Sequence, residues 1–285
     1  MMVRMLADER YELLKKYLTP YPGATVAFSG GTDSTLLLAA ANDALNGAVT
    51  AVTWQTEVTS DEEIDAAMRV AEELGVSHRI VSDSFLENEP AAANPPDRCY
   101  HCRKRMYEGI LKLSGGGAGA VIMEGVNLDD LGDFRPGLRA AREIGVVHPL
   151  VEAGLTKDDI REISRAIGLS NWDREASPCL ASRIAYGVRV TSVRLNRIER
   201  AEAWLRGQGY RHARVRLIDD VHASIEVDRN QVGQAQADLL NINSFLCELG
   251  FAVVEIDPRG YRMGNMNTEV ASSAMKPPRN DGTAR

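Results

Sequence analysis

Short β-prone runs alternate with helix-forming segments over the first two thirds of the chain, and this alternation constrains the fold more than any other feature. The β-prone runs occupy residues 24–31, 48–54, 77–82, 119–125 and 146–150. Helix-forming segments follow them at residues 33–43, 60–75, 100–113, 137–145 and 156–169. Strands that alternate with helices form a parallel sheet that is covered on both faces. The sequence therefore predicts a doubly wound α/β domain over residues 1–186.

The pattern changes after residue 186. A helix-forming segment at residues 191–209 is followed by two β-prone runs, 211–218 and 222–228, which are close enough in sequence to form a hairpin. A second helical segment at 231–250 and a last β-prone run at 251–257 complete this part. We expect a smaller α+β domain over residues 187–270, followed by a disordered tail over the proline-containing, polar residues 271–285.

The distribution of charge and cysteine predicts a cytoplasmic protein. No apolar run approaches the roughly 20 residues that a membrane-spanning helix needs. Residues 1–18 carry charges throughout, which indicates an amphipathic helix and not a cleaved leader, and no membrane partner is expected. In the cytoplasm, four cysteines are better explained by metal binding or catalysis than by disulfide bonds.

The charge balance argues against a general nucleic-acid binder, because the formal net charge is −7 and the isoelectric point is near 5.4. One local exception is an arginine-rich stretch from Arg183 to Arg216, which holds only Glu199 and Glu202 as counter-charges. Its arginines are at positions 183, 189, 194, 197, 200, 206, 211, 214 and 216. Two interpretations stay open for this stretch, namely a solvated helix face and a phosphate-binding patch.

The sequence FSGGTDST, residues 28–35, lies where the first predicted strand passes into the first predicted helix. A glycine pair at such a point lets successive backbone N–H groups converge on an anion, with the positive end of the helix dipole behind them. We expect hydroxyl donors from Ser29, Ser34 and Thr35, and a Mg²⁺ ligand in Asp33. The stretch is neither a Walker A loop nor a dinucleotide fingerprint. The plainer alternative is a turn that only links strand to helix.

This stretch resembles the SGGxDS loop of the PP-loop, or N-type, ATP pyrophosphatases. That family cleaves ATP between its α- and β-phosphates, adenylates an oxygen of the substrate, and lets a nucleophile displace AMP. The resemblance implies that residues of the loop bind the nucleotide: Ser29, Gly30, Gly31, Thr32, Asp33, Ser34 and Thr35. Residues 124–137, EGVNLDDLGDFRPG, look like the family's second nucleotide loop. The resemblance places Gly125, Asn127 and Asp130 near the nucleotide and Arg135 near its phosphates.

Residues 155–191 resemble the sulfur-transferase branch called LarE more closely. The matching features are the pair Trp172-Asp173, the sequence PCLASR at 178–183 and the pair Tyr186-Gly187. Residues 257–267, DPRGYRMGNMN, match that branch's Gly-Tyr-Arg-x-Gly ending. The resemblance implies a pyridinium-3,5-dicarboxylate mononucleotide as substrate. Each carboxylate would be activated as an acyl-adenylate and converted to a thiocarboxylate, for the nickel-pincer cofactor of lactate racemase.

The same resemblance assigns roles to individual residues and to a second copy of the chain. Cys179 and Asp33 would be catalytic, and Arg183 would meet a substrate phosphate or carboxylate. Arg214 and Arg216 match arginines that handle phosphate at a subunit interface, which implies a homo-oligomer built through the C-terminal domain.

The sequence RCYHCRKR, residues 98–105, departs from the best-known members of the branch, in which the PCLASR cysteine stands alone and gives up its own sulfur. Cys99 and Cys102 add two thiols to Cys179. Three thiolates are the ligand set of a [4Fe–4S] cluster with one open iron, which could hold a sulfide and spare the protein. We favour this interpretation, with the sulfide or another sulfur donor supplied from outside.

Other interpretations of these cysteines stay open. Cys99 and Cys102 could form a redox dithiol, or half of a zinc site that His101 would not complete. They could also be bystanders to a sacrificial Cys179. The fourth cysteine, Cys247, falls on an apolar helix stripe, and we expect it in the core.

Two rival functions stay open. A tRNA thiolation enzyme of the PP-loop class would have the same loop and cluster, and the arginine-rich stretch favours it, whereas the acidic balance does not. A cluster-carrying scaffold without enzymatic activity would not need the two nucleotide loops. Salt-sensitive binding of tRNA would support the first rival, and absence of ATP cleavage would support the second.

Overall fold

The computed structural model describes residues 6–113, 121–132, 135–175 and 177–262. These residues form two compact units, one that ends at Cys179 and one that begins at Leu180, whereas the sequence placed the boundary after residue 186. The predicted tail, residues 271–285, lies outside the described residues. No helix in the described ranges is long and apolar enough to cross a membrane.

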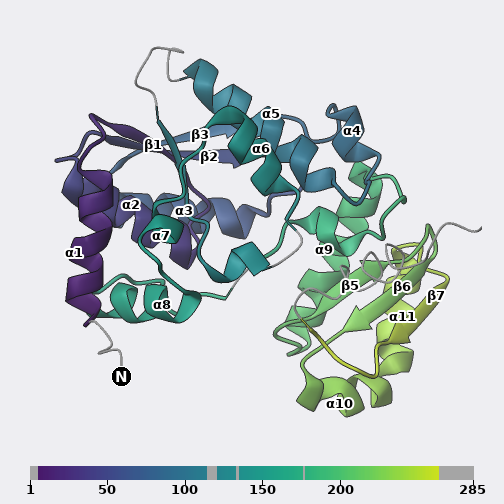
Figure 1. The fold of residues 1–285 in the computed structure, drawn as a ribbon. Coiled ribbons are helices and arrows are strands. Elements are labelled where there is room, and N and C mark those ends of the chain that lie inside the picture. Colours follow the sequence, from purple (N-terminus) through teal and green to yellow (C-terminus); the bar gives the residue numbers. More distant parts are fainter. Residues whose placement is uncertain (1–5, 114–120, 133–134, 176, 263–285) are drawn as a thin grey trace, which may run out of the picture. The chain divides into compact units, whose positions relative to one another are not determined.

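The first unit is built on a parallel sheet of four strands (Figure 1). The strands are β1 (Ala24–Ala27), β2 (Val49–Gln55), β3 (Ser77–Ser82) and β4 (Ile122–Glu124), in the order β3-β2-β1-β4. Four of the five β-prone runs therefore form strands as predicted. The fifth was predicted wrongly: Val147 makes only an isolated bridge with Met123. Pro149, which has no N–H to give to a ladder, begins the short helix α7 (Pro149–Glu152) two residues later.

The strand order creates a switch point between β1 and β4. The chain runs outward from β1 through β2 to β3, and then crosses to place β4 on the other side of β1. In open parallel sheets, ligands bind outside the carboxyl ends of the strands at such a reversal. The FSGG sequence follows β1 and the second predicted nucleotide loop follows β4, so the topology brings the two loops to one place.

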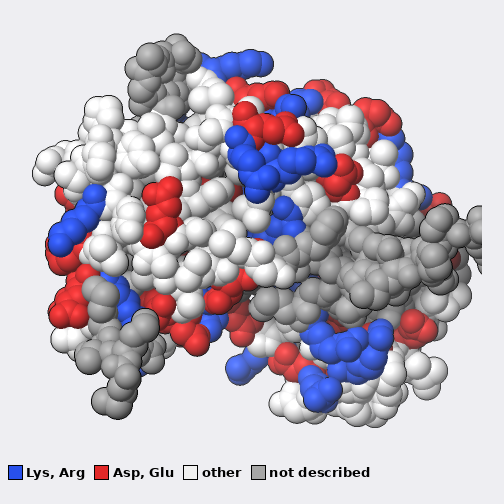
Figure 2. Space-filling model, viewed as in Figure 1, with Lys and Arg blue, Asp and Glu red and all other residues white. Residues whose placement is uncertain are grey.

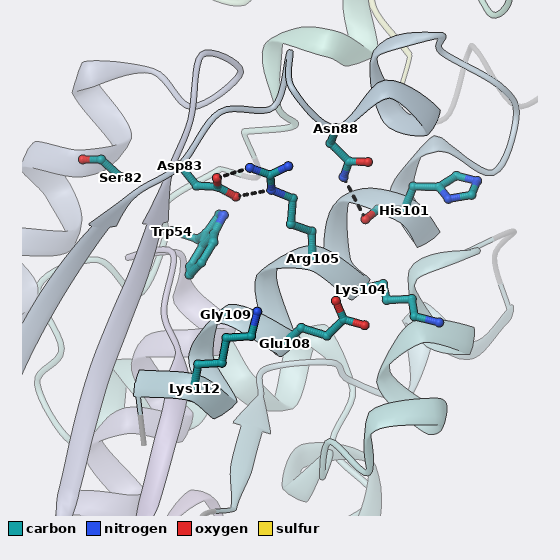
Figure 3. Close-up of a pocket in the computed structure, with 10 residues that line it drawn as sticks. All are labelled: Trp54, Ser82, Asp83, Asn88, His101, Lys104, Arg105, Glu108, Gly109 and Lys112. Atoms are coloured by element: carbon teal, nitrogen blue, oxygen red, sulfur yellow. Dashed lines mark hydrogen bonds and ion pairs between the residues drawn. The ribbon is translucent and has the colours of Figure 1, made fainter. Parts of the chain in front are cut away.

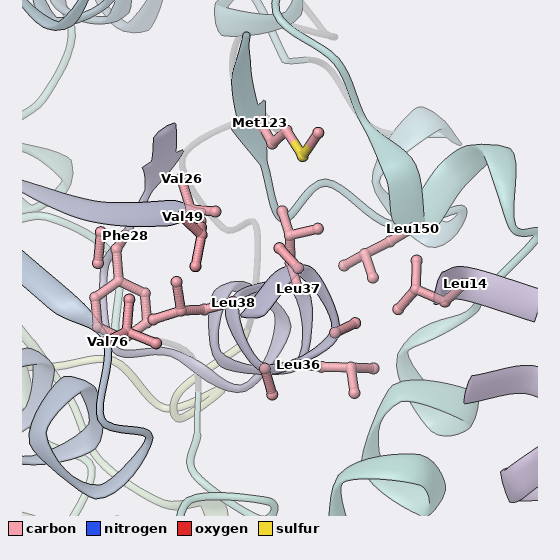
Figure 4. Packing of buried hydrophobic residues seen from close by; sticks show 14 of the residues in the cluster. Leu14, Val26, Phe28, Leu36, Leu37, Leu38, Val49, Val76, Met123 and Leu150 are labelled. Atoms are coloured by element: carbon pink, nitrogen blue, oxygen red, sulfur yellow. The ribbon is translucent and has the colours of Figure 1, made fainter. Parts of the chain in front are cut away.

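Helices cover both faces of this sheet, and alternate residues of β1, β2 and β4 supply the two cores. The helices are α1 (Ala7–Leu18), α2 (Thr32–Ala44), α3 (Asp61–Glu73), α4 (Glu89–Ala92), α5 (Arg98–Leu113), α6 (Gly137–Ile144), α7 and α8 (Lys157–Ala166). Val26 and Met123 pack with α1, α2 and α8 (Figure 4), whereas Ala27 and Ile122 pack with α5 and α6. Helix α3 begins with a capping box, in which Ser60 and Glu63 exchange hydrogen bonds. The doubly wound prediction is confirmed.

The second unit is a small α+β domain with its own sheet. Its strands are β5 (Arg214–Leu217), β6 (His222–Glu226) and β7 (Val253–Ile256), and β5 and β6 form the predicted antiparallel hairpin. Its helices are α9 (Ser192–Gly207), α10 (Val232–Ala237) and α11 (Leu239–Glu248), with 3₁₀ turns at Leu180–Arg183 and Arg229–Gln231.

Two predictions for the second unit were wrong in detail. The single helix expected at 231–250 is broken at Asp238, whose carboxylate accepts a hydrogen bond of 2.6 Å from the Tyr210 hydroxyl. Cys247, expected in the core, is exposed. The buried face of α11 runs through Ile242 and Leu246, one helical turn apart, and Cys247 lies next to that face on the solvent side.

Candidate active site

The loop after β1 requires glycine at position 30, because of its backbone angle and because another residue comes close to it. Gly30 has a φ of +67°, and a Cβ there would lie 2.8 Å from both Cα and N of Ala67 in α3. On either side of Gly30 in the chain, the hydroxyl oxygens of Ser29 and Ser34 lie 3.2 Å apart. The Gly31 nitrogen lies 3.4 Å from Ser29 Oγ, to which it donates. Hydroxyl groups and backbone N–H groups therefore meet at the N-terminus of α2, as an anion site requires.

The rear of this loop is supported by Asn171 and Arg174, which flank the pair Trp172-Asp173 and were not predicted as site residues. Asn171 is buried, and its Nδ2 donates to Gly30 O and to Thr35 Oγ1, both at 2.9 Å. The Thr32 hydroxyl donates to the carbonyl groups of Asn171 and Arg174 at 3.2 Å. The hydroxyls of Thr32 and Thr35 thus hold the 171–174 segment against the loop, and the hydroxyl groups at the front of the loop belong to Ser29 and Ser34.

Asp33 is paired with a lysine from a distant helix. The Nζ of Lys157, the first residue of α8, lies 2.8 and 2.9 Å from the two carboxylate oxygens of Asp33. Burial raises the pKa of Asp33, and the nearby Lys157 ammonium offsets part of that rise. The backbone N–H of Lys157 also donates to Asp129 in the loop after β4, at 2.8 Å. Lys157 therefore joins both predicted nucleotide loops.

The loop after β4 lies directly against the loop after β1. A Cβ at Gly125 would come within 2.8 Å of Ser34 N and 2.9 Å of the Asp33 carbonyl carbon. Asn127 is buried, and its Oδ1 accepts from the N–H groups of Asp129 and Asp130, so its side chain shapes the 3₁₀ turn Asp129–Gly132. The contact at Gly125 therefore places this loop against the loop after β1, and the hydrogen bonds of Asn127 fix its shape.

The charged residues of the second loop also converge on Asp33. Asp130 forms an ion pair with Arg135, with 2.6 Å between Oδ1 and a guanidinium nitrogen. Both residues lie near Asp33, where Asp130 raises the pKa of the Asp33 carboxyl group and Arg135 lowers it. The structure thus brings together the predicted residues Asp33, Gly125, Asn127, Asp130 and Arg135 at the β1–β4 switch point.

Of the three cysteines of the predicted cluster, two lie on α5 of the first unit, and Cys179 lies near one of them, Cys102. Cys99 and Cys102 lie in the first turn and a half of α5, three residues apart and so on one face of the helix. The pKa of Cys102 is raised to about 12, chiefly by burial, and further by the nearby thiols of Cys179 and Cys99. All four cysteines are thiols. In the part of the chain that the structure describes, no three His, Cys, Asp or Glu side chains stand at metal-binding distances.

The predicted arginines of the second unit are drawn together by internal carboxylates. Arg183 is buried and pairs with Glu202 through Nε at 3.0 Å. Arg216 donates to Glu226 and to the Ser182 carbonyl, both at 2.8 Å. The Arg214 guanidinium lies over the Tyr261 ring, 5.5 Å from its centroid. These three side chains form a compact cationic group with its own counter-ions inside this unit.

Comparison with known proteins identifies the family. A family model described as "Queuosine biosynthesis protein QueC" matches residues 23–93, which include the loop after β1. Pyridinium-3,5-bisthiocarboxylic acid mononucleotide synthase of Lactiplantibacillus plantarum is 36% identical over 252 residues, which are 88% of this chain and 91% of the relative. This chain belongs to the LarE family.

LarE membership also settles the class of enzyme and is consistent with the fold. A further relative, "Uncharacterized protein slr1717" of Synechocystis, is 35% identical and covers 92% of this chain and 98% of its own length. A solved NMN synthetase from Francisella tularensis has the same fold, with a TM-score of 0.51 and 17% identity over 61% of this chain and 76% of that one. The chain is therefore an ATP-dependent enzyme of the PP-loop class.

A pocket of about 560 Å³ lies elsewhere on the first unit of this LarE-family chain, beside α5 (Figure 3). It is lined by Trp54, Ser82, Asp83, Asn88, His101, Lys104, Arg105, Glu108, Gly109 and Lys112, none of which was predicted as a site residue. Its central cation is already neutralised, because Arg105 donates from two nitrogens to Asp83 at 2.6 and 2.5 Å. This pocket is thus not where the nucleotide loops meet.

Proposed function

We propose that this enzyme adenylates the carboxylates of pyridinium-3,5-dicarboxylate mononucleotide and converts them to thiocarboxylates. The observation that carries the proposal is the meeting of the two nucleotide loops at Asp33, in a unit whose last residue is the PCLASR cysteine Cys179. The relative from L. plantarum, named for the bisthiocarboxylic product, supports the substrate.

The chain's own groups suit adenylation. Backbone N–H groups of the loop and the N-terminus of α2 would hold phosphate oxygens, and Lys157 and Arg135 bring two cations to the same place. A carboxylate of the substrate is a poor electrophile, and its attack on the α-phosphorus of ATP, with loss of pyrophosphate, gives it AMP as a leaving group. The protein's work in this step is to align the carboxylate and the phosphates.

A magnesium ion fits the donors at this place. Mg²⁺ takes oxygen ligands, and in nucleotide sites it uses one or two carboxylates with substrate phosphates and water. Asp33 supplies a carboxylate that is 24% exposed, with Asp130 nearby. When bound, the ion would neutralise charge on the phosphates as pyrophosphate leaves. Lys157 would then exchange its carboxylate partner for a phosphate oxygen.

For the sulfur, we propose that Cys99, Cys102 and Cys179 hold a [4Fe–4S] cluster. Three soft thiolate donors suit such a cluster, and both Cys99 and Cys179 are near enough to Cys102 to raise its pKa. When bound, the cluster would supply an exchangeable sulfide for the acyl carbon, where a C–S bond replaces the C–O bond to AMP. Loading would require Cys102 to lose the proton that burial makes it keep.

The sacrificial alternative uses the same adenylate with the sulfur of Cys179 itself. It needs neither Cys99 nor Cys102, and it consumes one chain for each sulfur delivered. Variants that lack Cys99 or Cys102 therefore distinguish the cluster scheme from the sacrificial scheme.

The tRNA-thiolation alternative is less well supported by the arginine-rich stretch than its sequence suggested. Arg183, Arg214 and Arg216 are turned to partners inside the second unit, and Arg197 stacks on Phe251 at 4.0 Å while donating to the Asp220 carbonyl. On the face shown in Figure 2, basic and acidic side chains are interspersed. Such a surface does not favour the phosphate backbone of RNA.

The test is a reaction of the purified, anaerobically reconstituted protein with ATP, Mg²⁺, sulfide and the pyridinium mononucleotide. Mass spectrometry should find thiocarboxylate in the nucleotide, with AMP and pyrophosphate formed in step with it. Transfer of sulfur to tRNA, with none to the pyridinium compound, would replace the proposal with the rival function. ATP cleavage that leaves the substrate unchanged would remove the sulfur-transfer role.

A further inference from the structure

Glu124 is a buried ionisable residue for which the proposed chemistry has no use. It is the last residue of β4, and it is 8% exposed. Its backbone N–H donates to the Val147 carbonyl at 3.0 Å, so the main chain is held independently of the side chain. The next residue is Gly125, which touches the start of α2. A carboxylate in such a place must be paired, because an unpaired buried charge is costly.

The partners of Glu124 both come from α5, the helix that carries Cys99 and Cys102. The Tyr107 hydroxyl donates to Glu124 Oε2 at 2.6 Å, and Arg103 forms an ion pair with Oε1. Arg103 also donates to the Tyr107 hydroxyl at 3.1 Å, which closes a triangle. Tyr107 is fully buried, and burial raises its pKa, so its hydroxyl keeps the proton that it donates.

The neighbours of this triangle are shaped to admit it. A Cβ at Gly137, the first residue of α6, would lie 2.5 Å from Arg103 Cδ, so the missing side chain makes room for the arginine stem. Cys102 precedes Arg103 in the helix and is close enough to Tyr107 to affect its pKa. One short path of contacts therefore runs from the cysteine end of α5 through Glu124 to the nucleotide loop.

Stability alone does not explain an ionic triangle here. Apolar side chains of similar size would hold a helix on a sheet at least as well, because desolvation offsets much of the gain of a buried ion pair. What hydrogen bonds of fixed geometry add is orientation. The same helix offers a natural comparison, since Tyr100 and Lys104 hold Glu143 of α6 at 2.8 and 3.1 Å in a second triangle that is exposed.

We propose that Glu124 is a positioning residue that fixes the cysteine end of α5 relative to the nucleotide loop. Its backbone belongs to the strand that carries the loop, and its carboxylate holds the helix that carries the thiols. The expected effect on the reaction, which is that the sulfur and the acyl carbon are aligned after adenylation, rests on the proposed function. It concerns the second half of the reaction and leaves nucleotide binding unchanged.

The experiment compares Glu124→Gln and Tyr107→Phe with the matched control Glu143→Gln. Pyrophosphate release with ATP and the pyridinium substrate should keep its kcat and its KM for ATP within about twofold, because the Glu124 main chain stays in place. Thiocarboxylate formation should fall roughly tenfold or more, since small misplacements of reacting groups have such effects. The Glu143→Gln protein should match the parent in both. If the two half-reactions fall together, or if neither falls, Glu124 has no positioning role.

A second measurement does not depend on the proposed function. Iodoacetamide alkylation of the metal-free protein, followed by mass spectrometry, gives the rate at each cysteine. In both triangle variants Cys102 should react severalfold faster, while Cys247 in the second unit keeps the parental rate and serves as internal reference. A parental rate at Cys102 overturns the inference even if the reaction proceeds. If the parent protein makes no thiocarboxylate but Cys102 is alkylated faster in the two variants, only the proposed function is overturned.

Discussion

Lys157 and Asp33, 124 residues apart in the chain, form an ion pair in which one ammonium group contacts both carboxylate oxygens at 2.8 and 2.9 Å. The pair explains how a phosphate loop without its own lysine obtains a cation. In a Walker A loop the lysine is part of the loop. Here it comes from the first turn of α8, whose start is fixed by the Thr156 side chain as N-cap.

Replacing Lys157 with alanine should raise the KM for ATP roughly tenfold, the loss expected for one charge-assisted contact to phosphate. Lys157→Arg should recover part of that loss, because the charge is kept and its reach is changed. Pyrophosphate release measured against ATP concentration gives the value. Lys16→Ala, at an exposed position on α1, is the control. An unchanged KM in the Lys157→Ala protein would show that the lysine serves only Asp33.

Asp33→Ala should abolish adenylate formation and leave the fold intact. The carboxylate's task is to align Mg²⁺ and phosphates, and the ion pair that is lost with it is about a quarter exposed, so the stability should change by about 1 kcal/mol or less. Pyrophosphate release and thermal unfolding check the two halves of this prediction. Asp158→Ala, one residue beyond Lys157 and exposed, should behave as the parent. Full pyrophosphate release from the Asp33→Ala protein would contradict the assigned role.

Gly125→Ala should separate the two nucleotide loops. The added methyl group would meet backbone atoms of Asp33 and Ser34 at 2.8 to 3.0 Å, and backbone cannot move aside as a side chain can. We expect weaker ATP binding, by calorimetry, and a loss of about 1–3 kcal/mol in stability from overpacking. Gly132→Ala lies in the same loop with open space around its Cβ, and it should bind ATP normally. Equal affinity in both variants would argue against contact between the loops as a requirement.

The sequence predicted most of the fold because the signals are local. Four strands, the Ser60 capping box and the β5–β6 hairpin each follow from short stretches whose apolar pattern and turn residues agree. The break at Asp238 and the exposure of Cys247 did not follow, since each depends on what α11 packs against. At the break, Asp238 accepts a hydrogen bond from Tyr210, 28 residues away, and no pattern within the helix announces it.

The candidate site likewise contains residues that the sequence could predict and residues that it could not. The glycine loop and the cysteine pair could be recognised from adjacent letters, whereas Lys157, Asn171 and Glu124 could not. Each of these three meets its partner across 17 or more residues of chain, and nothing in the local sequence names that partner. The predicted helical segment 156–169 does include Lys157, but nothing in its sequence says that its first turn faces Asp33.

Asp83→Asn should destabilise the first unit at neutral pH and not at acid pH. Hydrogen bonds from Arg105 lower the pKa of Asp83, so the folded state favours the carboxylate. A lowered carboxyl pKa gives stability that is present above the unfolded value, near 4, and is lost as the pH falls through the folded value. Because Arg105 is 37% exposed, we expect a difference of about 1 kcal/mol at pH 7. Urea unfolding should show it shrinking below about pH 4, and a constant difference would contradict the assignment.

The last prediction separates the two sources of sulfur through the cysteines of α5. If Cys99, Cys102 and Cys179 hold a cluster together, anaerobic reconstitution should yield about four irons per chain. Changing any one of them to alanine should then lose both the iron and repeated turnover with sulfide. Cys247→Ala, at an exposed position in the second unit, is the control and should keep both.

The sacrificial scheme predicts a different pattern from the same proteins. Cys179→Ala would be inactive, but Cys99→Ala and Cys102→Ala would each deliver one sulfur per chain, and the spent parent would lack one sulfur at Cys179. Both schemes need Cys179, so only the two α5 variants distinguish them. We expect the cluster, because Cys102 lies close enough to both other thiols for them to affect its pKa. A Cys99→Ala protein that transfers sulfur at the parental rate, with sulfide supplied, would decide for the sacrificial scheme.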